Sequence, residues 1–193
     1  MDTILPVRQP WNKGLIVGQK RPLLPRQVWS IRVRLEMSGS ARDLALFNLA
    51  IDSKLRASDL VRLKIEDICS GLVVRDRAII TQLKTGRPVQ FEITEVARQS
   101  VERLLAAQSL GSGYLFRSRS HHRLHISARQ YARIVHRWIS NIGLDGRGFG
   151  THSLRRTKVA QLYRKTGNLR AVQQPLGHAK IETTVRYLGV ESG

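Results

Sequence analysis

The chain has 193 residues, of which 41% are hydrophobic and 24% are charged, as is ordinary for a globular protein with one core. Its 33 lysines and arginines stand against 14 aspartates and glutamates, a formal net charge of +19 that indicates a polyanionic partner, nucleic acid before membrane. The sequence has no apolar run near the roughly 20 residues of a membrane span and no signal-peptide core, and its single cysteine excludes an intrachain disulfide and a cysteine-based zinc site.

The basic residues are concentrated in the C-terminal half. Between Arg103 and Ile181 there are 15 lysines and arginines, seven up to Arg137 and eight from Arg147, against one acid, Asp145. We therefore expect one strongly positive side on the molecule. The low cysteine content favours a reducing compartment, so we expect a cytoplasmic location, on the nucleoid when the protein is bound to DNA.

The first residues predict an irregular segment before a helical domain. Residues 1–27 hold four of the six prolines and show little periodicity, which indicates an extended basic leader. The leader could follow a DNA backbone or form a solvated tail, and both alternatives stay open. From Val28 apolar residues recur at helical spacing, and two more helices are expected over about 41–53 and 57–63. No boundary divides residues 28–193, which we interpret as one domain.

A small antiparallel sheet is expected inside this helical protein. Residues 73–74 and 78–80 read as strands, and apolar residues alternate with polar ones over 89–93. The stretch Thr-Gly-Arg-Pro at 85–88 predicts a hairpin turn between the last two strands. The expected fold class is α+β, mostly α-helical, with a small three-stranded antiparallel sheet.

Three further helices are predicted after the sheet. Thr94 is expected to cap a helix that runs to about Gln108. Ser127 and Gln130 have the spacing of a capping box and open the helix with the clearest apolar periodicity in the chain. A glycine-rich loop precedes the last of the three, which begins at Thr151.

The helix that Ser127 opens also carries a basic stripe. Arg129, Arg133 and Arg137 recur every four residues opposite the apolar face, and no acid lies between them in the sequence. We therefore interpret them as DNA contacts rather than as a solvated face of salt bridges. Arg156 is a further candidate DNA contact, with a structural role as its alternative.

The functional prediction depends on the stretch from Thr151 to Tyr187. His152 and Arg155 are three residues apart, so they lie on the same face of a helix and can address one anion. A Leu-Gly-His element ends at His178, and Tyr187 follows nine residues later. A phenol beside cationic groups can attack a phosphate.

The order and spacing of these residues resemble the signature of the tyrosine recombinase (phage integrase) family. The resemblance implies a tyrosine recombinase-like catalytic domain over residues 28–193. It implies site-specific cleavage and rejoining of DNA, in which Tyr187 is the nucleophile and forms a 3′-phosphotyrosyl intermediate. The ordinary alternative for a tyrosine near a C-terminus is packing, and Tyr163 is interpreted in that way.

The resemblance also implies two arginines on the reacting phosphate. Arg155 is one, and Arg56, within the stretch SKLRASDL at residues 53–60, is the other. Because arginine is always charged and binds phosphate with two donors, such a pair can stabilise the transition state as two metal ions would. We therefore expect a metal-independent enzyme without a cofactor.

The resemblance gives the remaining roles to three residues. His152 would accept the proton of the tyrosine hydroxyl and return it in the reverse step. His178 would donate a hydrogen bond to the phosphate, with helix capping as its alternative. Lys84, placed at the end of a strand over 79–83 and before the turn, would protonate the 5′-oxygen leaving group, with an exposed turn lysine as its alternative.

The resemblance covers the catalytic domain alone. The leader is too short to be the separate N-terminal DNA-clamping domain that family members commonly carry, and the chain ends six residues after Tyr187. The expected partner is double-stranded DNA, with a homo-oligomer on DNA and no membrane. Two alternatives stay open, a DNA-binding accessory protein of this fold that does not recombine, and DNA relaxation like that of a type IB topoisomerase. The complete set of six residues favours an enzyme over a binding protein.

Overall fold

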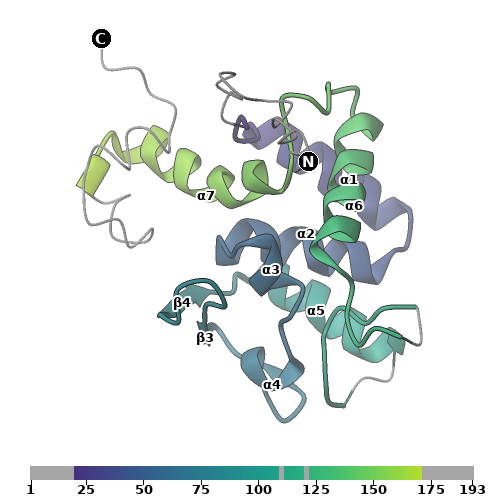
Figure 1. The fold of residues 1–193 in the computed structure, drawn as a ribbon. Coiled ribbons are helices and arrows are strands. Elements are labelled where there is room, and N and C mark those ends of the chain that lie inside the picture. Colours follow the sequence, from purple (N-terminus) through teal and green to yellow (C-terminus); the bar gives the residue numbers. More distant parts are fainter. Residues whose placement is uncertain (1–19, 109–110, 120–121, 171–193) are drawn as a thin grey trace, which may run out of the picture.

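A computed structural model describes residues 20–108, 111–119 and 122–170 (Figure 1). Two candidate catalytic residues, His178 and Tyr187, lie outside these ranges. In chain order the described elements are α1 (Pro25–Met37), α2 (Ala41–Ser53), α3 (Ala57–Leu60), α4 (Ile65–Ile68), β1 (Cys69–Ser70), β2 (Val73–Val74), β3 (Arg77–Thr81), β4 (Pro88–Glu92), α5 (Glu95–Gln108), α6 (Ala128–Asn141) and α7 (Thr151–Thr166). The expected α+β fold, mostly helical with short antiparallel strands, is confirmed.

Helix α2 crosses the middle of the described molecule (Figure 1). Every residue from Asp43 to Ser53 is buried, and the helix packs against α5, α7 and α1. Apolar side chains cover most of its circumference, which is the pattern of a helix enclosed by others. Its first turn is capped by Ser40, whose hydroxyl accepts a hydrogen bond from the Asp43 N–H at 3.4 Å. It ends at Lys54, which has a left-handed backbone conformation.

The strands form two separate hairpins, not the single three-stranded sheet that the sequence predicts. Strand β1 pairs antiparallel with β2, and β3 pairs antiparallel with β4 from Arg77 opposite Glu92 to Thr81 opposite Pro88. The chain turns back between β1 and β2 at Gly71, whose φ of 62° suits glycine. Strand β2 therefore pairs with β1 and does not join the β3–β4 hairpin. The sequence did not predict β1 or α4, because elements of two and four residues carry too little periodicity.

Helix α1 begins at Pro25, three residues earlier than the periodicity predicts. Proline fits the first turn of a helix, where a backbone N–H has no partner within the helix. Leu23, just before it, is fully buried, and its N–H donates to the Thr157 hydroxyl on α7 at 3.0 Å. The end of the expected leader, residues 20–27, thus packs against the body of the domain. Residues 1–19 lie outside the described ranges.

Most of the buried apolar side chains belong to one core, to which α6 contributes a whole face. The α6 residues in that core are Tyr131, Ile134, Val135, Trp138 and Ile139. A small second cluster lies along α7, where Tyr163 packs beside Val159 and Ala160 as the sequence predicts. Within the described ranges, the structure has no helix with the length and apolar character needed to cross a bilayer.

Candidate active site

The two candidate catalytic arginines lie near the C-terminal end of α2. Arg155 is in the first turns of α7, and its Nε donates to the carbonyl oxygen of Lys54 at 2.8 Å. Lys54 has φ 55° and ψ 20°, and this left-handed residue ends α2. Arg56 follows two residues later as the residue that precedes α3. The short turn from Lys54 to Arg56 therefore contains Arg56 and positions Arg155 through the Lys54 carbonyl.

Arg56 is joined to the β3–β4 hairpin through Gln82. The Arg56 Nη1 donates to Gln82 Oε1 at 2.6 Å, and the Thr85 hydroxyl donates to the same oxygen at 2.8 Å. Gln82 is buried, so this acceptor is shielded from water. A hydrogen bond to a charged donor in such a place is stronger than one at the surface. Gln82 thus fixes the Arg56 guanidinium and the hairpin turn relative to each other.

Lys84 lies in that hairpin turn and is exposed. Strand β3 ends at Thr81, so Lys84 belongs to the turn rather than to the end of a strand as expected. The turn is also attached to α3, because the Leu83 N–H donates to the buried carboxylate of Asp59 at 3.0 Å. Lys84 is therefore carried by a turn with two links to the segment that bears Arg56.

His152 shares its surroundings with both arginines. Burial of part of the ring lowers the pKa of His152 below its ordinary 6.5, and the positive charges of Arg155, Arg156 and Arg56 lower it further. The imidazole is therefore neutral at pH 7. A neutral imidazole can accept a proton, and it does so here beside guanidinium groups that attract an anion. The structure thus brings His152, Arg155 and Arg56 together.

The basic stripe of α6 lies on the exposed side of the helix, as the sequence predicts. Arg129, Arg133 and Arg137 are all exposed. Arg137, however, forms an ion pair with Asp43 of α2 at 3.1 Å. That acid is remote in sequence, so the absence of acids along α6 itself could not reveal it. The structure therefore gives Arg137 a protein partner in addition to its proposed role.

Arg156 differs from these three arginines. Only 7% of its surface is exposed, and its Nη1 donates to the carbonyl oxygen of Lys20 at 2.9 Å. The contact attaches the segment before α1 to α7. This placement favours the structural alternative for Arg156 over a DNA contact.

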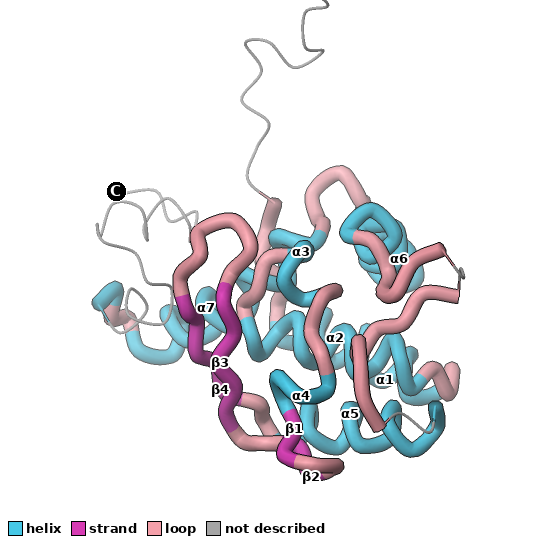
Figure 2. Tube along the Cα trace, turned by 60° about the horizontal axis from the view of Figure 1, so that its bottom comes forward, coloured by secondary structure: helices cyan, strands magenta, loops and turns pink. Residues whose placement is uncertain are grey.

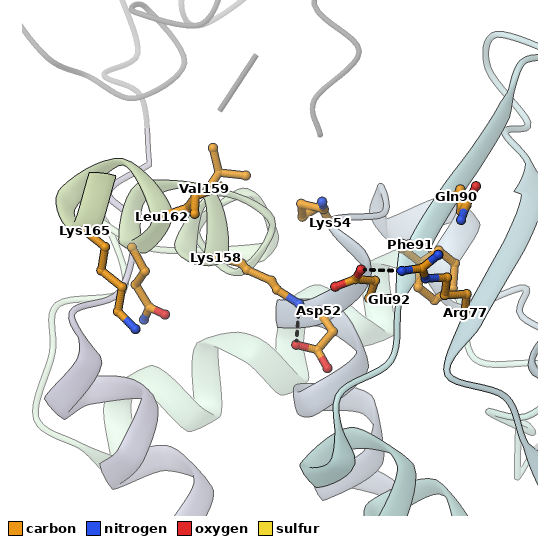
Figure 3. Close-up of a pocket in the computed structure, with 11 residues that line it drawn as sticks. Asp52, Lys54, Arg77, Gln90, Phe91, Glu92, Lys158, Val159, Leu162 and Lys165 are labelled. Carbon is orange, nitrogen blue, oxygen red and sulfur yellow. Dashed lines mark hydrogen bonds and ion pairs between the residues drawn. The ribbon is translucent and has the colours of Figure 1, made fainter. Parts of the chain in front are cut away.

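A cavity of about 670 Å³ lies beside the candidate site, between the end of α2, the β3–β4 hairpin and α7 (Figure 3). Among the lining residues, ion pairs join Lys158 of α7 to Asp52 of α2 at 3.1 Å, and Arg77 to Glu92 within the β3–β4 hairpin at 3.4 Å. Burial lowers the pKa of Lys54, another lining residue. None of the candidate catalytic residues in the described ranges lines this cavity. We therefore place the candidate site on the more open surface around His152.

The arrangement suits chemistry at a phosphodiester. Two guanidinium groups can hold the non-bridging oxygens, and a neutral imidazole can take a proton from an attacking hydroxyl. Tyr131 is a poor candidate for that hydroxyl, because it is buried and burial raises the pKa of its phenol. In the described ranges, no three His, Cys, Asp or Glu side chains are grouped so that they could hold a metal ion.

Two features of the site could not be found from the sequence. Gln82 is 26 residues from Arg56, and no spacing rule marks a glutamine as the partner of a distant arginine. The role of Lys54 belongs to its carbonyl and its left-handed backbone, which residue type does not reveal. A lysine at a helix end gives no signal for either property.

Comparison with known proteins places the sequence in a family. A family model described as the phage integrase family matches residues 23–192, nearly all of the chain. The chain belongs to the phage integrase family. The matched range contains the positions of all the candidate catalytic residues, among them His178 and Tyr187 outside the described ranges.

Individual relatives carry integrase or recombinase names. A probable integrase/recombinase, YoeC of Bacillus subtilis, is 30% identical over 155 residues, which are 80% of this chain and 81% of that protein. Tyrosine recombinase XerC of Pseudomonas aeruginosa is 35% identical over 186 residues, which are 90% of this chain and 58% of that protein. The chain therefore spans most of the first relative and little more than half of the second.

Solved structures share the fold. The XerA recombinase superimposes with a TM-score of 0.71 at 20% identity, covering 97% of this chain and 61% of that one. The XerH site-specific recombinase, in a post-cleavage complex with its palindromic difH substrate, superimposes with a TM-score of 0.69 at 20% identity, covering 91% of this chain and 51% of that one. At these identities the likeness shows a shared fold.

Proposed function

We propose that this phage integrase family member cleaves and rejoins double-stranded DNA at specific sites, with Tyr187 as the nucleophile. The observation that supports it most is the convergence of Arg56, Arg155 and a neutral His152 at one end of α2. These are three of the groups that such chemistry requires, and they come from two segments about 100 residues apart in sequence. The family match over residues 23–192 supports the same function.

In the proposed cleavage step one phosphorus–oxygen bond forms while another breaks, and each proton that moves has a donor and an acceptor. The Tyr187 oxygen forms a bond to the phosphorus while its proton passes to His152, and the bond between the phosphorus and the 5′-oxygen breaks. Lys84 supplies the proton that the leaving 5′-oxygen takes up. The product is a 3′-phosphotyrosyl link and a free 5′-hydroxyl, which can attack in the reverse direction and rejoin the strand. His178 donates a hydrogen bond to the phosphate.

We further propose that this reaction needs neither metal nor cofactor. Arg56 and Arg155 would supply the positive charge that metal ions supply in other phosphodiester enzymes. The proposed setting is the cytoplasm, where the protein acts on double-stranded DNA as a homo-oligomer.

The experiment is incubation of the purified chain with supercoiled plasmid in excess EDTA, followed by mapping of protein-linked DNA ends. We expect nicked or relaxed plasmid, and protein-linked ends that cluster at a few sequences. The Arg155→Ala variant should lose the activity by a hundredfold or more, which corresponds to about 3 kcal/mol of transition-state stabilisation.

Each competing function has its own outcome. Plasmid that stays supercoiled while bound by the protein would point to an accessory DNA-binding protein. Linked ends spread over the whole plasmid would point to a relaxing activity like that of a type IB topoisomerase. Activity that EDTA removes and Mg²⁺ restores would show that the arginine-based mechanism is wrong.

A further inference from the structure

A second group of basic side chains lies at the N-terminal end of α2, whereas the candidate active site lies at its C-terminal end. Two neighbouring hollows, of about 350 and 280 Å³, lie between the α1–α2 turn, α6 and the loop that precedes it. Arginines from four segments line them, and we call this group the distal arginine face: Arg34, Arg42, Arg119, Arg133 and Arg137.

One acid lines the two hollows, and it is buried. Asp43 is 4% exposed and accepts hydrogen bonds from Arg42 at 2.7 Å, Arg137 at 3.1 Å and the Trp138 indole at 3.4 Å. A single carboxylate beneath five arginines leaves most of their charge uncompensated. Asp43 instead holds two guanidinium groups in fixed positions at the rim of the hollows, so part of the cost of ordering them is met before a ligand arrives.

The other three arginines are unpaired within the described part of the chain. Arg34, Arg119 and Arg133 are exposed, and their guanidinium groups form no ion pair or hydrogen bond there. Like charges gathered on one face repel each other, and a polyanion relieves that repulsion. Guanidinium groups that are partly fixed and partly free suit the oxygens of successive phosphates, which accept hydrogen bonds from several directions.

The position of the face relative to the candidate active site suggests which polyanion it binds. From Ser40 to Lys54 the axis of α2 advances about 21 Å at 1.5 Å per residue, and Lys54 holds Arg155. Six base pairs of duplex DNA extend about the same distance at 3.4 Å each. Helix α6 also packs against α3, which follows Arg56. In Figure 2 the β3–β4 turn, α3 and α6 lie along one edge of the molecule, where one duplex could meet all three.

We propose that the distal arginine face binds backbone phosphates of the DNA duplex, about six base pairs from the phosphate that Arg56 and Arg155 hold. The inference rests on the proposed function for the position of that second phosphate. It adds Arg34, Arg42 and Arg119 to the DNA contacts expected on α6, and it makes them one site with Arg133 and Arg137. The contacts are to phosphate, so they supply affinity and register rather than sequence recognition.

The first experiment measures duplex binding by fluorescence anisotropy over a range of salt concentrations. The test variant is Arg34→Gln with Arg119→Gln, which removes two exposed, unpaired charges. The control is Arg75→Gln with Arg103→Gln, which removes two exposed arginines that line neither hollow. A 24-base-pair duplex of arbitrary sequence serves as the probe.

We expect the test variant to lower the slope of log affinity against log salt by about two units, since each lost phosphate contact removes about one. The control should keep a slope close to that of the wild type, and both variants should have the melting temperature of the wild type. A test variant with the wild-type slope would overturn the inference. The inference would also be overturned if the test variant lowered the slope on duplex RNA of the same length but not on DNA.

The second experiment tests the spacing with cleavage substrates. A nicked substrate that traps the covalent complex is shortened on either side of the cleaved bond. On full-length substrate at limiting protein, the test variant should form less adduct than the wild type. Removing the duplex beyond about five base pairs on one side should abolish that difference, because no phosphate then reaches the distal arginine face. A difference that persists on both shortened substrates would contradict the spacing.

The two proposals can fail separately. Binding is measured without cleavage, so a lowered slope supports the distal arginine face even if no adduct forms and the proposed function is wrong. Normal adduct formation together with an unchanged slope would leave the function standing and overturn the face alone.

Discussion

At the level of single residues, the site is a group of positive charges around one imidazole. Burial of part of the ring is the largest cause of the lowered pKa of His152, and the charges of Arg155, Arg156 and Arg56 lower it further. Of these arginines, the buried Arg156 donates to the Lys20 carbonyl, and the partly buried Arg155 donates to the Lys54 carbonyl. The ring is therefore kept neutral by its partial burial and by charges that are themselves fixed, and it can serve as a proton acceptor at neutral pH.

The lowered pKa of His152 predicts a pH dependence. Its titration, followed by NMR, should give a pKa below 6.5 in the wild type and a higher value in Arg155→Gln, where one of the opposing charges is gone. Below pH 6.5 the unfolded chain takes up this proton before the folded chain does, so the His152 contribution should lower stability as the pH falls through that range. A wild-type pKa at or above 6.5, or one unmoved by the substitution, would contradict the charge arrangement.

Gln82 should act as a positioning residue for Arg56. In Gln82→Leu the guanidinium of Arg56 and the hydroxyl of Thr85 lose their shared acceptor. We expect single-turnover cleavage to slow about tenfold, the effect of roughly 1.4 kcal/mol for a hydrogen bond to a charged group, with DNA affinity little changed. The control is Gln90→Leu, at an exposed glutamine of the same hairpin. If affinity falls as much as rate, or if the two variants behave alike, Gln82 has no positioning role.

At the level of elements, the ends of α2 organise the molecule. Ser40 caps its start, beside the distal arginine face, and the left-handed Lys54 ends it beside Arg155. The helix is buried along nearly its whole length, so neither end can shift without disturbing the core. The two basic sites are therefore held at a fixed separation.

The left-handed conformation of Lys54 should carry a measurable cost. Lys54→Gly and Lys54→Ala both remove the side chain, but only glycine adopts φ 55° without strain. The glycine variant should therefore be the more stable of the two by about 1 kcal/mol, because the strain relieved exceeds the added entropy of the unfolded chain. Urea denaturation measures the difference. Equal stabilities would mean that the backbone at Lys54 is not strained in this way.

Some elements could be predicted from the sequence, and others could not. Helix α6 was predictable because a serine cap and five apolar residues at helical spacing agree along 14 residues. The pairing of β2 with β1 was not, because short strands leave open which neighbour each one joins. The start of α1 at Pro25 is hard to predict because proline is common in irregular segments and also favours the first turn of a helix.

The candidate site was predictable in its residue types but not in its supports. The spacing of His152 and Arg155 follows directly from helix geometry. The family resemblance identifies Arg56, and the structure places it near both. The buried groups that hold the site in place, Gln82 and Asp59, come from packing between distant segments, which a single sequence does not encode in any local pattern.

At the level of the whole molecule, we propose that the basic residues behind the net charge of +19 serve two purposes, chemistry around His152 and binding on the distal arginine face. Around His152 the arginines lie near a proton acceptor and can stabilise charge that develops during a reaction. No histidine or tyrosine is among the residues that line the distal arginine face, and the carboxylate of Asp43 is paired with arginines, so we expect the charge there to contribute to affinity. On the proposed function, a duplex that spans both sites would be bound by the distal arginine face and cleaved near His152.

The most direct test of the central claim is whether Tyr187 forms the covalent bond to DNA. A nicked duplex that cannot be rejoined is incubated with the wild type, Tyr187→Phe and Tyr163→Phe, and the products are separated in denaturing gels. We expect a covalent protein–DNA adduct with the wild type and with Tyr163→Phe, whose tyrosine packs on α7. Tyr187→Phe should bind DNA with wild-type affinity and form no adduct. An adduct that persists in Tyr187→Phe, or that disappears only in Tyr163→Phe, would contradict the proposed mechanism.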